Sequence, residues 1–215
     1  MGVTERSAGN MKDPAARAAA LAKAGLGGLP AYFLRQAHGA DIVRVGPSTP
    51  TDQTPEADGW ITDSPDRVLC VFAADCTPLF VWDSDRRAVG VFHSGWKGTA
   101  AGMPREAAAS FQRFFGIPAD RLEARVGPRI GPCCYKVGAE LEGRFRPESF
   151  RRSDAGLYLD LAAEARAQLV ESGVPAGAIS VDAGCTSCDN DRFFSFRREK
   201  QDCRMMAYAA LRARA

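Results

Sequence analysis

The stretch Arg67–Thr99, RVLCVFAADCTPLFVWDSDRRAVGVFHSGWKGT, contains two apolar runs that each end at a reactive side chain. The first run ends at Asp75 and Cys76, and the second ends at His93. Short runs rich in Val and Phe and bounded by Pro, Gly or Asp are typical of buried strands. We therefore expect Cys76 and His93 to lie at the rim of a sheet, where a rigid scaffold holds them.

A third candidate strand leads to the other histidine of the chain. The segment Tyr32–Gly39, YFLRQAHG, places His38 directly before a glycine that permits a tight turn. The chain holds two histidines, and both lie beside a strand end and a turn glycine. Two imidazole nitrogens and one thiolate suit zinc or copper, and three protein ligands with an open fourth position are typical of a catalytic metal site. We predict that His38, Cys76 and His93 bind one metal ion; the competing interpretation is that two of them are ordinary core or turn residues.

Polar side chains beside these three residues are further candidates for the site. Asp75, if it lies on the strand, points to the face opposite Cys76. There it could accept a hydrogen bond from a metal ligand, act as a general acid or base, or serve as a structural turn carboxylate. Lys97 lies in SGWKGT, where N–H groups before a helix could bind phosphate, although glycine before a helix is usually only a cap. Arg197 would suit a phosphate or a carboxylate if it turned inward.

The composition is typical of a soluble globular protein and indicates no unusual partner. Of 215 residues, 46% are hydrophobic and 25% are charged, and such a chain can bury a full core. The 28 basic and 26 acidic residues leave a formal charge of +2, so neither nucleic acid nor an acidic membrane is expected as a partner. No apolar segment approaches the ~18 residues of a membrane span. The first residues also lack the apolar core of a secretory signal, so we expect a cytoplasmic protein.

The seven cysteines include an adjacent pair, Cys133-Cys134, and a Cys185-x-x-Cys188 pair. Without a secretory signal, free thiols with a metal or a reactive thiol are favoured over a disulfide framework. The second pair could be half of a zinc ribbon, but no other pair follows at a suitable spacing. We therefore interpret these four cysteines as structural or incidental.

The order of the expected elements indicates the fold class. Apolar and β-branched runs predict strands at 32–36, 41–45, 60–62, 68–74, 79–82, 88–92, 122–126, 179–181 and 193–198. Periodicity and capping residues predict helices at 13–24, 99–115, 139–145 and 159–172. Alanine content favours a helix at 204–211, although packing of this segment beside the core could override that preference. Pro104 marks either the start of the second helix or a kink in it. The first two strands have the spacing of a hairpin, with His38 in the turn. Strands and helices do not alternate strictly, which favours an α+β or mixed α/β fold.

The motifs, in their order along the chain, resemble the YfiH family, also described as the laccase-domain or multicopper polyphenol oxidoreductase family and as purine nucleoside phosphorylases. The resemblance runs from about residue 32 to residue 211 and covers nearly the whole chain. Its landmarks are QAHG (36–39), ADG (57–59), ADCTP (74–78), HSGWKG (93–98), GPRIG (127–131) with Tyr135, and FSFRR (194–198).

The resemblance implies a single-domain α/β/β/α layered fold, which we place at 31–215 after a helical segment at 1–30. It implies a zinc ion held by two histidines and one cysteine, which map onto His38, His93 and Cys76. It also implies phosphorolysis of adenosine, inosine, guanosine and methylthioadenosine, with some adenosine deamination. On this basis we assign two sets of residues: catalytic residues Asp75, Cys76 and His93, and residues for nucleoside or phosphate binding, Gln36, Lys97 and Arg197.

Other functions compete with this one. The older family name implies copper-dependent phenol oxidation, but laccases reduce oxygen with several coppers and many histidines, and this chain has two histidines. A cysteine hydrolase would use Cys76 as nucleophile and His93 as base. A non-catalytic binding protein is a further alternative, because the amino-terminal part of the family pattern is shortened here. The chain also has Ser94 and Lys97 where the family usually has Ala and Arg, and Lys136 where Glu is common.

Overall fold

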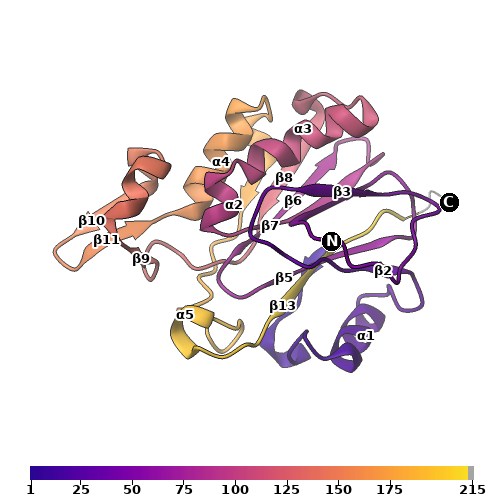
Figure 1. Ribbon diagram of the computed structural model, residues 1–215, viewed down its shortest axis with the longest axis horizontal. Coiled ribbons are helices and arrows are strands. Elements are labelled where there is room, and N and C mark those ends of the chain that lie inside the picture. The colour runs from indigo at the N-terminus through magenta and orange to yellow at the C-terminus, as the bar shows by residue number, and fades with distance from the viewer. Residues whose placement is uncertain (213–215) are drawn as a thin grey trace.

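Two β-sheets pack face to face, and helices cover the outer face of each sheet (Figure 1). The structure is a computed structural model and describes residues 1–212. From one side to the other, the layers are a helical layer with α3 (Met103–Phe115) and α4 (Leu161–Glu171), a six-stranded sheet, a four-stranded sheet and α1 (Pro14–Lys23). The chain therefore has the expected mixed α/β fold with α/β/β/α layers.

The six-stranded sheet contains the strands that the opening stretch predicts. Its order is β12 (Ile179–Val181), β8 (Leu122–Val126), β6 (Thr77–Asp83), β7 (Val89–Ser94), β4 (Gly59–Thr62) and β3 (Ile42–Val45). The outer pairs β12–β8 and β3–β4 are parallel, and the inner pairs are antiparallel. Because both faces of the central strands are covered, almost every residue of β6 and β7 is buried. That is why these strands read as continuous apolar runs in the sequence.

The second sheet joins the two ends of the chain. Its order is β1 (Gly2–Val3), β13 (Met205–Ala209), β5 (Val68–Ala73) and β2 (Ala31–Tyr32). A small third sheet of β10 (Phe150–Ser153), β11 (Gly156–Leu159) and β9 (Lys136–Val137) projects from the side of the molecule (Figure 1). The expected division at residue 30 stays a prediction; the segment before it contributes β1 and α1 to this architecture.

Polar caps and prolines fix where the helices begin. The side chains of Asp13 and Asp160 accept N–H groups in the first turns of α1 and α4. The short helices are α2 (Trp96–Ala100) and α5 (Phe196–Glu199), and Ser195 caps the latter. Short 3₁₀ segments lie at Arg6–Ala8, Ala119–Arg121, Ala139–Arg144, Pro147–Ser149 and Ala176–Ala178. No helix among residues 1–212 is both long and apolar enough to cross a membrane.

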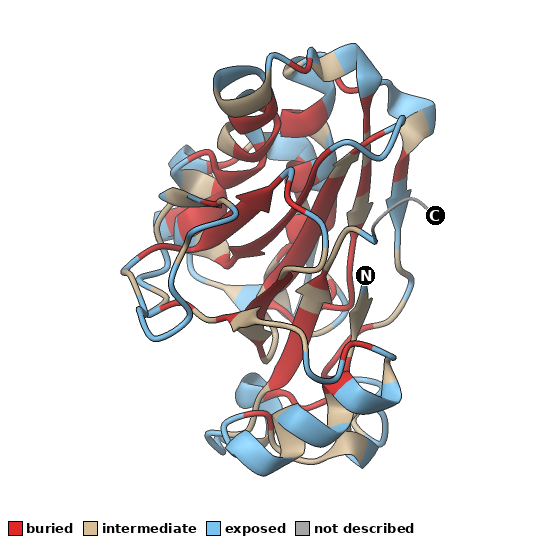
Figure 2. Cartoon of the chain, turned by 90° about the vertical axis from the view of Figure 1, so that its right-hand side faces the viewer, coloured by how far each residue is buried: buried red, intermediate tan, exposed pale blue. Residues whose placement is uncertain are grey.

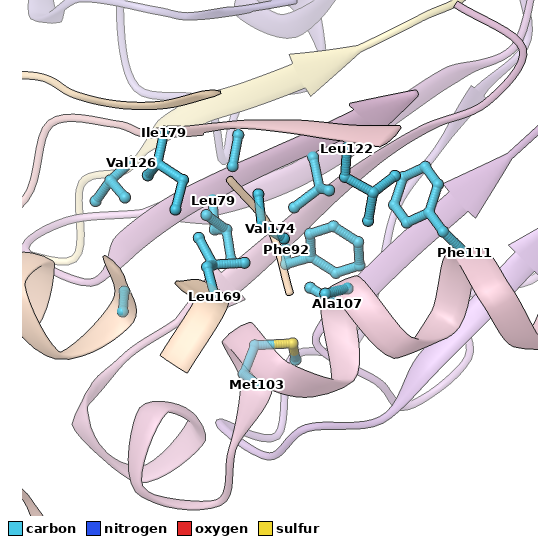
Figure 3. Close-up of a cluster of buried hydrophobic side chains, with 14 of the residues drawn as sticks. Leu79, Phe92, Met103, Ala107, Phe111, Leu122, Val126, Leu169, Val174 and Ile179 are labelled. Atoms are coloured by element: carbon cyan, nitrogen blue, oxygen red, sulfur yellow. The ribbon is translucent and has the colours of Figure 1, made fainter. Parts of the chain in front are cut away.

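Three apolar layers hold these elements together. Phe92, Phe111 and Leu169 belong to the layer between the six-stranded sheet and its helices (Figure 3). Trp60, Phe80 and neighbouring side chains fill the space between the two sheets, and α1 covers a third layer. Figure 2 shows the buried residues concentrated in the sheets, whereas the outer surface of the helices is exposed. The site described below lies where strands of the two sheets end.

Some sequence predictions were wrong about local structure. The segment 204–211 forms β13 instead of a helix, because its backbone pairs with β5 and its side chains enter the core. The segment 193–198 is a turn followed by α5 instead of a strand, because Ser195 caps a helical turn. The first two strands make no hairpin: β2 pairs with β5, and β3 pairs with β4 in the other sheet.

The predicted helix boundaries also differ in places. The expected helix at 99–115 breaks at Gly102, whose φ of 90° is unfavourable for other residues, so Pro104 lies in the first turn of α3. Leu159 belongs to β11, and α4 begins two residues later. The segment expected as a helix at 139–145 is 3₁₀ over Ala139–Arg144.

Candidate metal centre

The side chains of His38, Cys76 and His93 meet at one point of the structure. Their potential ligand atoms all lie within 4.8 Å of one another. His38 comes from the loop after β2, and Cys76 from the turn between β5 and β6. His93 lies inside β7, because that strand continues to Ser94, two residues beyond its expected end. The two imidazole ring centroids are 4.8 Å apart, with the rings nearly perpendicular at 86°.

A buried carboxylate, Asp58, holds two of these residues in place. It precedes β4 and accepts backbone N–H groups from Ala37, His38 and Gly39 at 3.1, 3.0 and 2.7 Å. Its Oδ1 also lies 2.8 Å from Nδ1 of His93. His38 has a φ of 62°, which is unusual for a residue other than glycine, and these hydrogen bonds support that conformation. This role of Asp58 could not be predicted from the sequence, although ADG (57–59) is one of the family motifs, because its partners are distant along the chain.

The contact with Asp58 determines which nitrogen of His93 is available. Burial by itself would raise the pKa of Asp58, but hydrogen bonds from His93 and the backbone lower it below its usual range. The carboxylate therefore accepts the proton on Nδ1 of His93, which leaves Nε2 with a lone pair in the neutral ring. Histidines that bind metals are commonly oriented by a carboxylate in this way.

Cys76 and His93 form a strongly interacting pair. Burial raises the pKa of Cys76, but the charges and hydrogen bonds of His93 and His38 outweigh it and lower that pKa to about 6. Burial lowers the pKa of His93, whereas Cys76 and Asp58 raise it to about 9. The surroundings thus favour a thiolate with positive charge beside it. A divalent cation would supply that charge, and two imidazole nitrogens with one thiolate are a donor set that zinc and copper bind.

Two glycines, Gly95 before α2 and Gly98 within it, allow the backbone to come close to the candidate ligands. A Cβ on Gly95 would lie 2.7 Å from Sγ of Cys76, and a Cβ on Gly98 would lie 2.6 Å from the carbonyl oxygen of Gly39. Side chains at these positions would therefore collide with Cys76 or with the loop that carries His38. These glycines are needed for close approach to the candidate ligands as well as for the start of a helix.

Replacing Gly95 by alanine should weaken metal binding and any activity that depends on the metal. The added methyl group forces the sulfur of Cys76 to move, and a displacement of about 1 Å at a reacting centre can cost ~100-fold in rate. We expect a comparable loss of metal affinity in competition with a chelator. Gly177→Ala is the matched control, because a Cβ there meets no atom within 4 Å. Equal metal affinity in the two variants would contradict this account of the site.

The candidate ligands open into a cavity of about 380 Å³, within the range of about 300–1,000 Å³ typical of small-molecule pockets. Lys12 and Arg204 bring positive charge to its wall, and both form ion pairs with Asp202. Phe196, 48% exposed, contributes an aromatic face to the same wall. These residues could not be predicted from the sequence, because the amino-terminal loop and the segment before β13 come together only in the fold.

Two predicted site residues have their polar groups engaged elsewhere. Gln36 lines the cavity, but its amide exchanges two hydrogen bonds with the backbone of Phe72, at 2.9 and 2.7 Å. Asp75 lies in a turn with a φ of 84° and not on a strand. Its carboxylate accepts Thr186 Oγ1 at 2.7 Å and the N–H of Arg197 at 2.6 Å. Within the part of the chain that the structure describes, Asp75 is not among the residues lining the cavity.

The two predicted cations, Lys97 and Arg197, are not among the residues that line this cavity. Arg197 lines a second cavity of about 620 Å³ together with Trp96 and Tyr135. Its guanidinium stacks 5.0 Å from the Tyr135 ring centroid and donates to the carbonyl of Lys136 at 2.7 Å. Lys97 is exposed on α2, with its Nζ 5.7 Å from the Trp96 ring centroid. The structure thus groups His38, Cys76 and His93 in one cavity and places Lys97 and Arg197 apart from it.

Similarity to known proteins identifies the family of this chain. The sequence profile of the family described as "Multi-copper polyphenol oxidoreductase laccase" matches residues 8–212. The chain belongs to this family. A crystal structure of a Bacillus licheniformis protein described as hypothetical protein YfiH superimposes with a TM-score of 0.86 at 31% identity, covering 92% of this chain and 80% of that one. The expected membership of the YfiH, or laccase-domain, family is confirmed.

Relatives of this laccase-domain chain carry the names of enzymes. A Geobacillus stearothermophilus protein named purine nucleoside phosphorylase YlmD is 36% identical over 193 residues, which cover 82% of this chain and 70% of the relative. A protein named adenosine deaminase RL5, from an unknown prokaryotic organism, is 34% identical over 149 residues. That match covers 66% of this chain and 56% of the relative, so it spans little more than half of that protein. The family description implies a metal, and the grouped His and Cys side chains could hold one.

Proposed function

We propose that this chain is a zinc-dependent purine nucleoside phosphorylase that acts on adenosine, inosine, guanosine and methylthioadenosine, with adenosine deamination as a side activity. The observation that supports this most directly is that one cavity is lined by three candidate metal ligands, an aromatic side chain and two cations. The volume of the cavity lies within the range typical of small-molecule pockets. Two relatives named purine nucleoside phosphorylase are 36% and 32% identical to this chain over 193 and 194 residues.

The reaction forms one bond and breaks one. A phosphate oxygen attacks C1′ of the ribose, and the bond from C1′ to the purine nitrogen breaks with its electron pair moving to the base. The proton that the attacking dihydrogen phosphate gives up passes, directly or through solvent, to that base. The products are ribose 1-phosphate and the free purine. The protein must therefore bind an anion beside the sugar, hold the base and stabilise its developing negative charge.

Residues of the cavity match these requirements. His38, Cys76 and His93 would hold zinc, which supplies Lewis acidity to the substrate when bound. Lys12 and Arg204 would bind the phosphate, because both cations face the cavity that contains the three ligands. Phe196 offers a flat apolar surface to the purine.

Positioning residues complete the proposed site. Asp58 fixes the ring of His93 and the loop of His38. Gln36 ties the loop before His38 to β5 through Phe72. Asp75 fixes the turn that carries Cys76, through Thr186 and the backbone of Arg197.

The test is an assay of base release. Zinc-loaded protein is incubated with inosine in the presence and absence of phosphate, and hypoxanthine and ribose 1-phosphate are quantified. Phosphate-dependent release of both products is the expected result. Adenosine run in parallel reports deamination as the appearance of inosine. Absence of base release from all four nucleosides by fully zinc-loaded protein would rule out the proposal.

Removing the cavity cations should raise the KM for phosphate more than the KM for nucleoside. Charged hydrogen bonds are worth about 1.5–3 kcal/mol, so we expect Lys12→Ala and Arg204→Ala each to raise the KM for phosphate by ~10- to 100-fold. The sequence prediction assigns phosphate to Lys97 and Arg197, so Lys97→Ala and Arg197→Ala are measured beside them. A selective phosphate defect in that second pair of variants would place the anion in the other cavity.

One feature of the site favours a second candidate. Two histidines and one cysteine are also the equatorial ligands of single-copper electron-transfer sites, which would agree with the oxidoreductase description of the family. Protein grown with both metals available separates the two functions. A copper–thiolate centre absorbs visible light strongly, whereas a zinc centre is colourless, and oxygen uptake with a phenol would accompany only the former.

A further inference from the structure

Four cysteines outside the candidate metal centre form a second cluster. The sulfur atoms of Cys133, Cys134, Cys185 and Cys188 all lie within 4.8 Å of one another. Sγ of Cys188 is 3.5 Å from that of Cys133 and 3.4 Å from that of Cys134. All seven cysteines belong to the described residues, and the structure joins none of them in a disulfide. Their spacing in the sequence left these four residues as structural or incidental, and the fold favours the structural alternative by bringing the two pairs together.

Strand pairing explains why two distant cysteine pairs meet. β8 and β12 are parallel neighbours, so the loops that follow them, 127–135 and 182–195, leave the sheet at the same edge. Arg129 and Cys185 form a β-bridge between these loops, and the N–H of Thr186 donates to the carbonyl of Arg129 at 2.9 Å. Neither loop contains four ligands, but together they do.

The spacing of the sulfurs fits a single tetrahedral ion. With a Zn–S distance of about 2.3 Å, two sulfurs on one tetrahedral zinc lie about 3.8 Å apart. The two contacts of Cys188, at 3.4 and 3.5 Å, and the upper limit of 4.8 Å for the whole group bracket that value. A cluster of four irons spreads its cysteines over separate iron atoms and requires a wider arrangement.

The backbone around the cluster is arranged to support thiolates. The N–H of Gly131 donates to Sγ of Cys185 at 3.2 Å. The turn in which the N–H of Cys188 donates to the carbonyl of Cys185, at 3.1 Å, brings both sulfurs of this pair to one side. A Cβ on Gly131 would lie 3.3 Å from Sγ of Cys133, so a glycine leaves room for the sulfurs. The buried guanidinium of Arg129 adds nearby positive charge, which offsets the net negative charge of four thiolates on a divalent ion.

We infer that Cys133, Cys134, Cys185 and Cys188 bind one structural Zn²⁺ ion that fastens the loop 127–135 to the loop 182–195. Binding releases the four thiol protons and leaves every zinc position occupied by protein, as in structural sites. This inference does not depend on the proposed enzymatic activity.

An ion bound at these cysteines would also stabilise the turn that carries Cys76 in the candidate metal centre. Thr186, next to Cys185, donates to Oδ1 of Asp75, and Arg198 donates to the carbonyl of Ser187 at 2.7 Å. Asp75 directly precedes Cys76 and has a backbone conformation that residues other than glycine rarely adopt. Loosening the loop 182–195 would therefore remove support from the turn that carries a ligand of the first centre.

Metal counting on the full-length protein tests the inference. Zinc and free thiols are quantified in wild type, Cys185→Ser/Cys188→Ser and His38→Ala/His93→Ala. Cys203→Ser is the control, because this cysteine lies outside both groups. We expect two zinc ions per chain in wild type and in the control, and one in each double variant. Wild type without zinc, or a cysteine double variant that retains as much zinc as wild type, would overturn the inference.

A spectroscopic readout on wild type avoids dependence on variants that fail to fold. Zinc X-ray absorption should give an average of about 2.5 sulfur ligands per zinc, since one site would supply four and the other one. In His38→Ala/His93→Ala the average should rise to about four sulfurs on the remaining zinc. Iron in the cysteine cluster, or a disulfide found there by alkylation before and after reduction, would overturn it. If wild type releases the base from nucleosides but holds no zinc at the four cysteines, the inference fails while the proposed function stands.

Discussion

Replacing Cys76 by serine should remove one metal ion per chain and abolish base release from purine nucleosides. A neutral serine hydroxyl is a poor substitute for a thiolate, and the remaining His38 and His93 leave the ion with two protein ligands. Lewis acidity is worth several kcal/mol of transition-state stabilisation, so a loss of about 1,000-fold or more in kcat is expected. Zinc content and kcat measured on the same preparation check this result. Cys203→Ser should keep both values.

Chelation and alkylation of the wild-type protein separate a metal ligand from a nucleophile. If Cys76 attacked the substrate directly, a chelator would leave turnover intact, and alkylation of the thiol would abolish it in metal-free protein. If Cys76 is a ligand, chelation stops turnover, added zinc restores it, and bound zinc protects the sulfur from alkylation. Full activity of a zinc-free preparation would reject the metal-dependent function.

The sequence predicted the sheet best where burial dominates. β5, β6 and β7 are covered on both faces, so their residues are apolar regardless of which way they point, and that run is visible without a structure. The three candidate ligands were found for a related reason. The chain has two histidines, and a rare side chain at the end of a buried strand is easy to recognise.

Features that depend on contacts between distant segments could not be predicted. β13 is alanine-rich and locally favours a helix, but pairing with β5 outweighs that preference. Lys12 and Arg204 are ordinary surface cations in the sequence and share a cavity only because β13 lies beside β1. The two cysteine pairs look unrelated in the sequence because they lie far apart along the chain. The parallel pairing of β8 and β12 brings them together in the fold.

Replacing Asp58 by alanine should cost both stability and metal affinity. This single carboxylate accepts three partly buried backbone N–H groups and pairs with the buried ring of His93, and its loss leaves all four donors without this partner. Breaking a buried, hydrogen-bonded pair typically costs about 3–5 kcal/mol, a large share of the roughly 5–15 kcal/mol that stabilises a domain. The loop would also lose the contacts that keep His38 in its left-handed conformation.

The asparagine variant separates the two effects of Asp58. Asp58→Asn keeps the volume but places an amide group against N–H donors and removes the charge beside His93, so metal affinity should fall by about 10- to 100-fold with a smaller loss of stability. Asp63→Asn is the matched control: it lies at the other end of β4 and forms an exposed ion pair with Arg44 at 3.0 Å, which is worth at most about 1 kcal/mol. Denaturant unfolding and zinc competition measure the two quantities. If Asp58→Asn binds zinc as tightly as the Asp63 variant, Asp58 does not orient His93 for a metal, and its hydrogen bonds serve the fold alone.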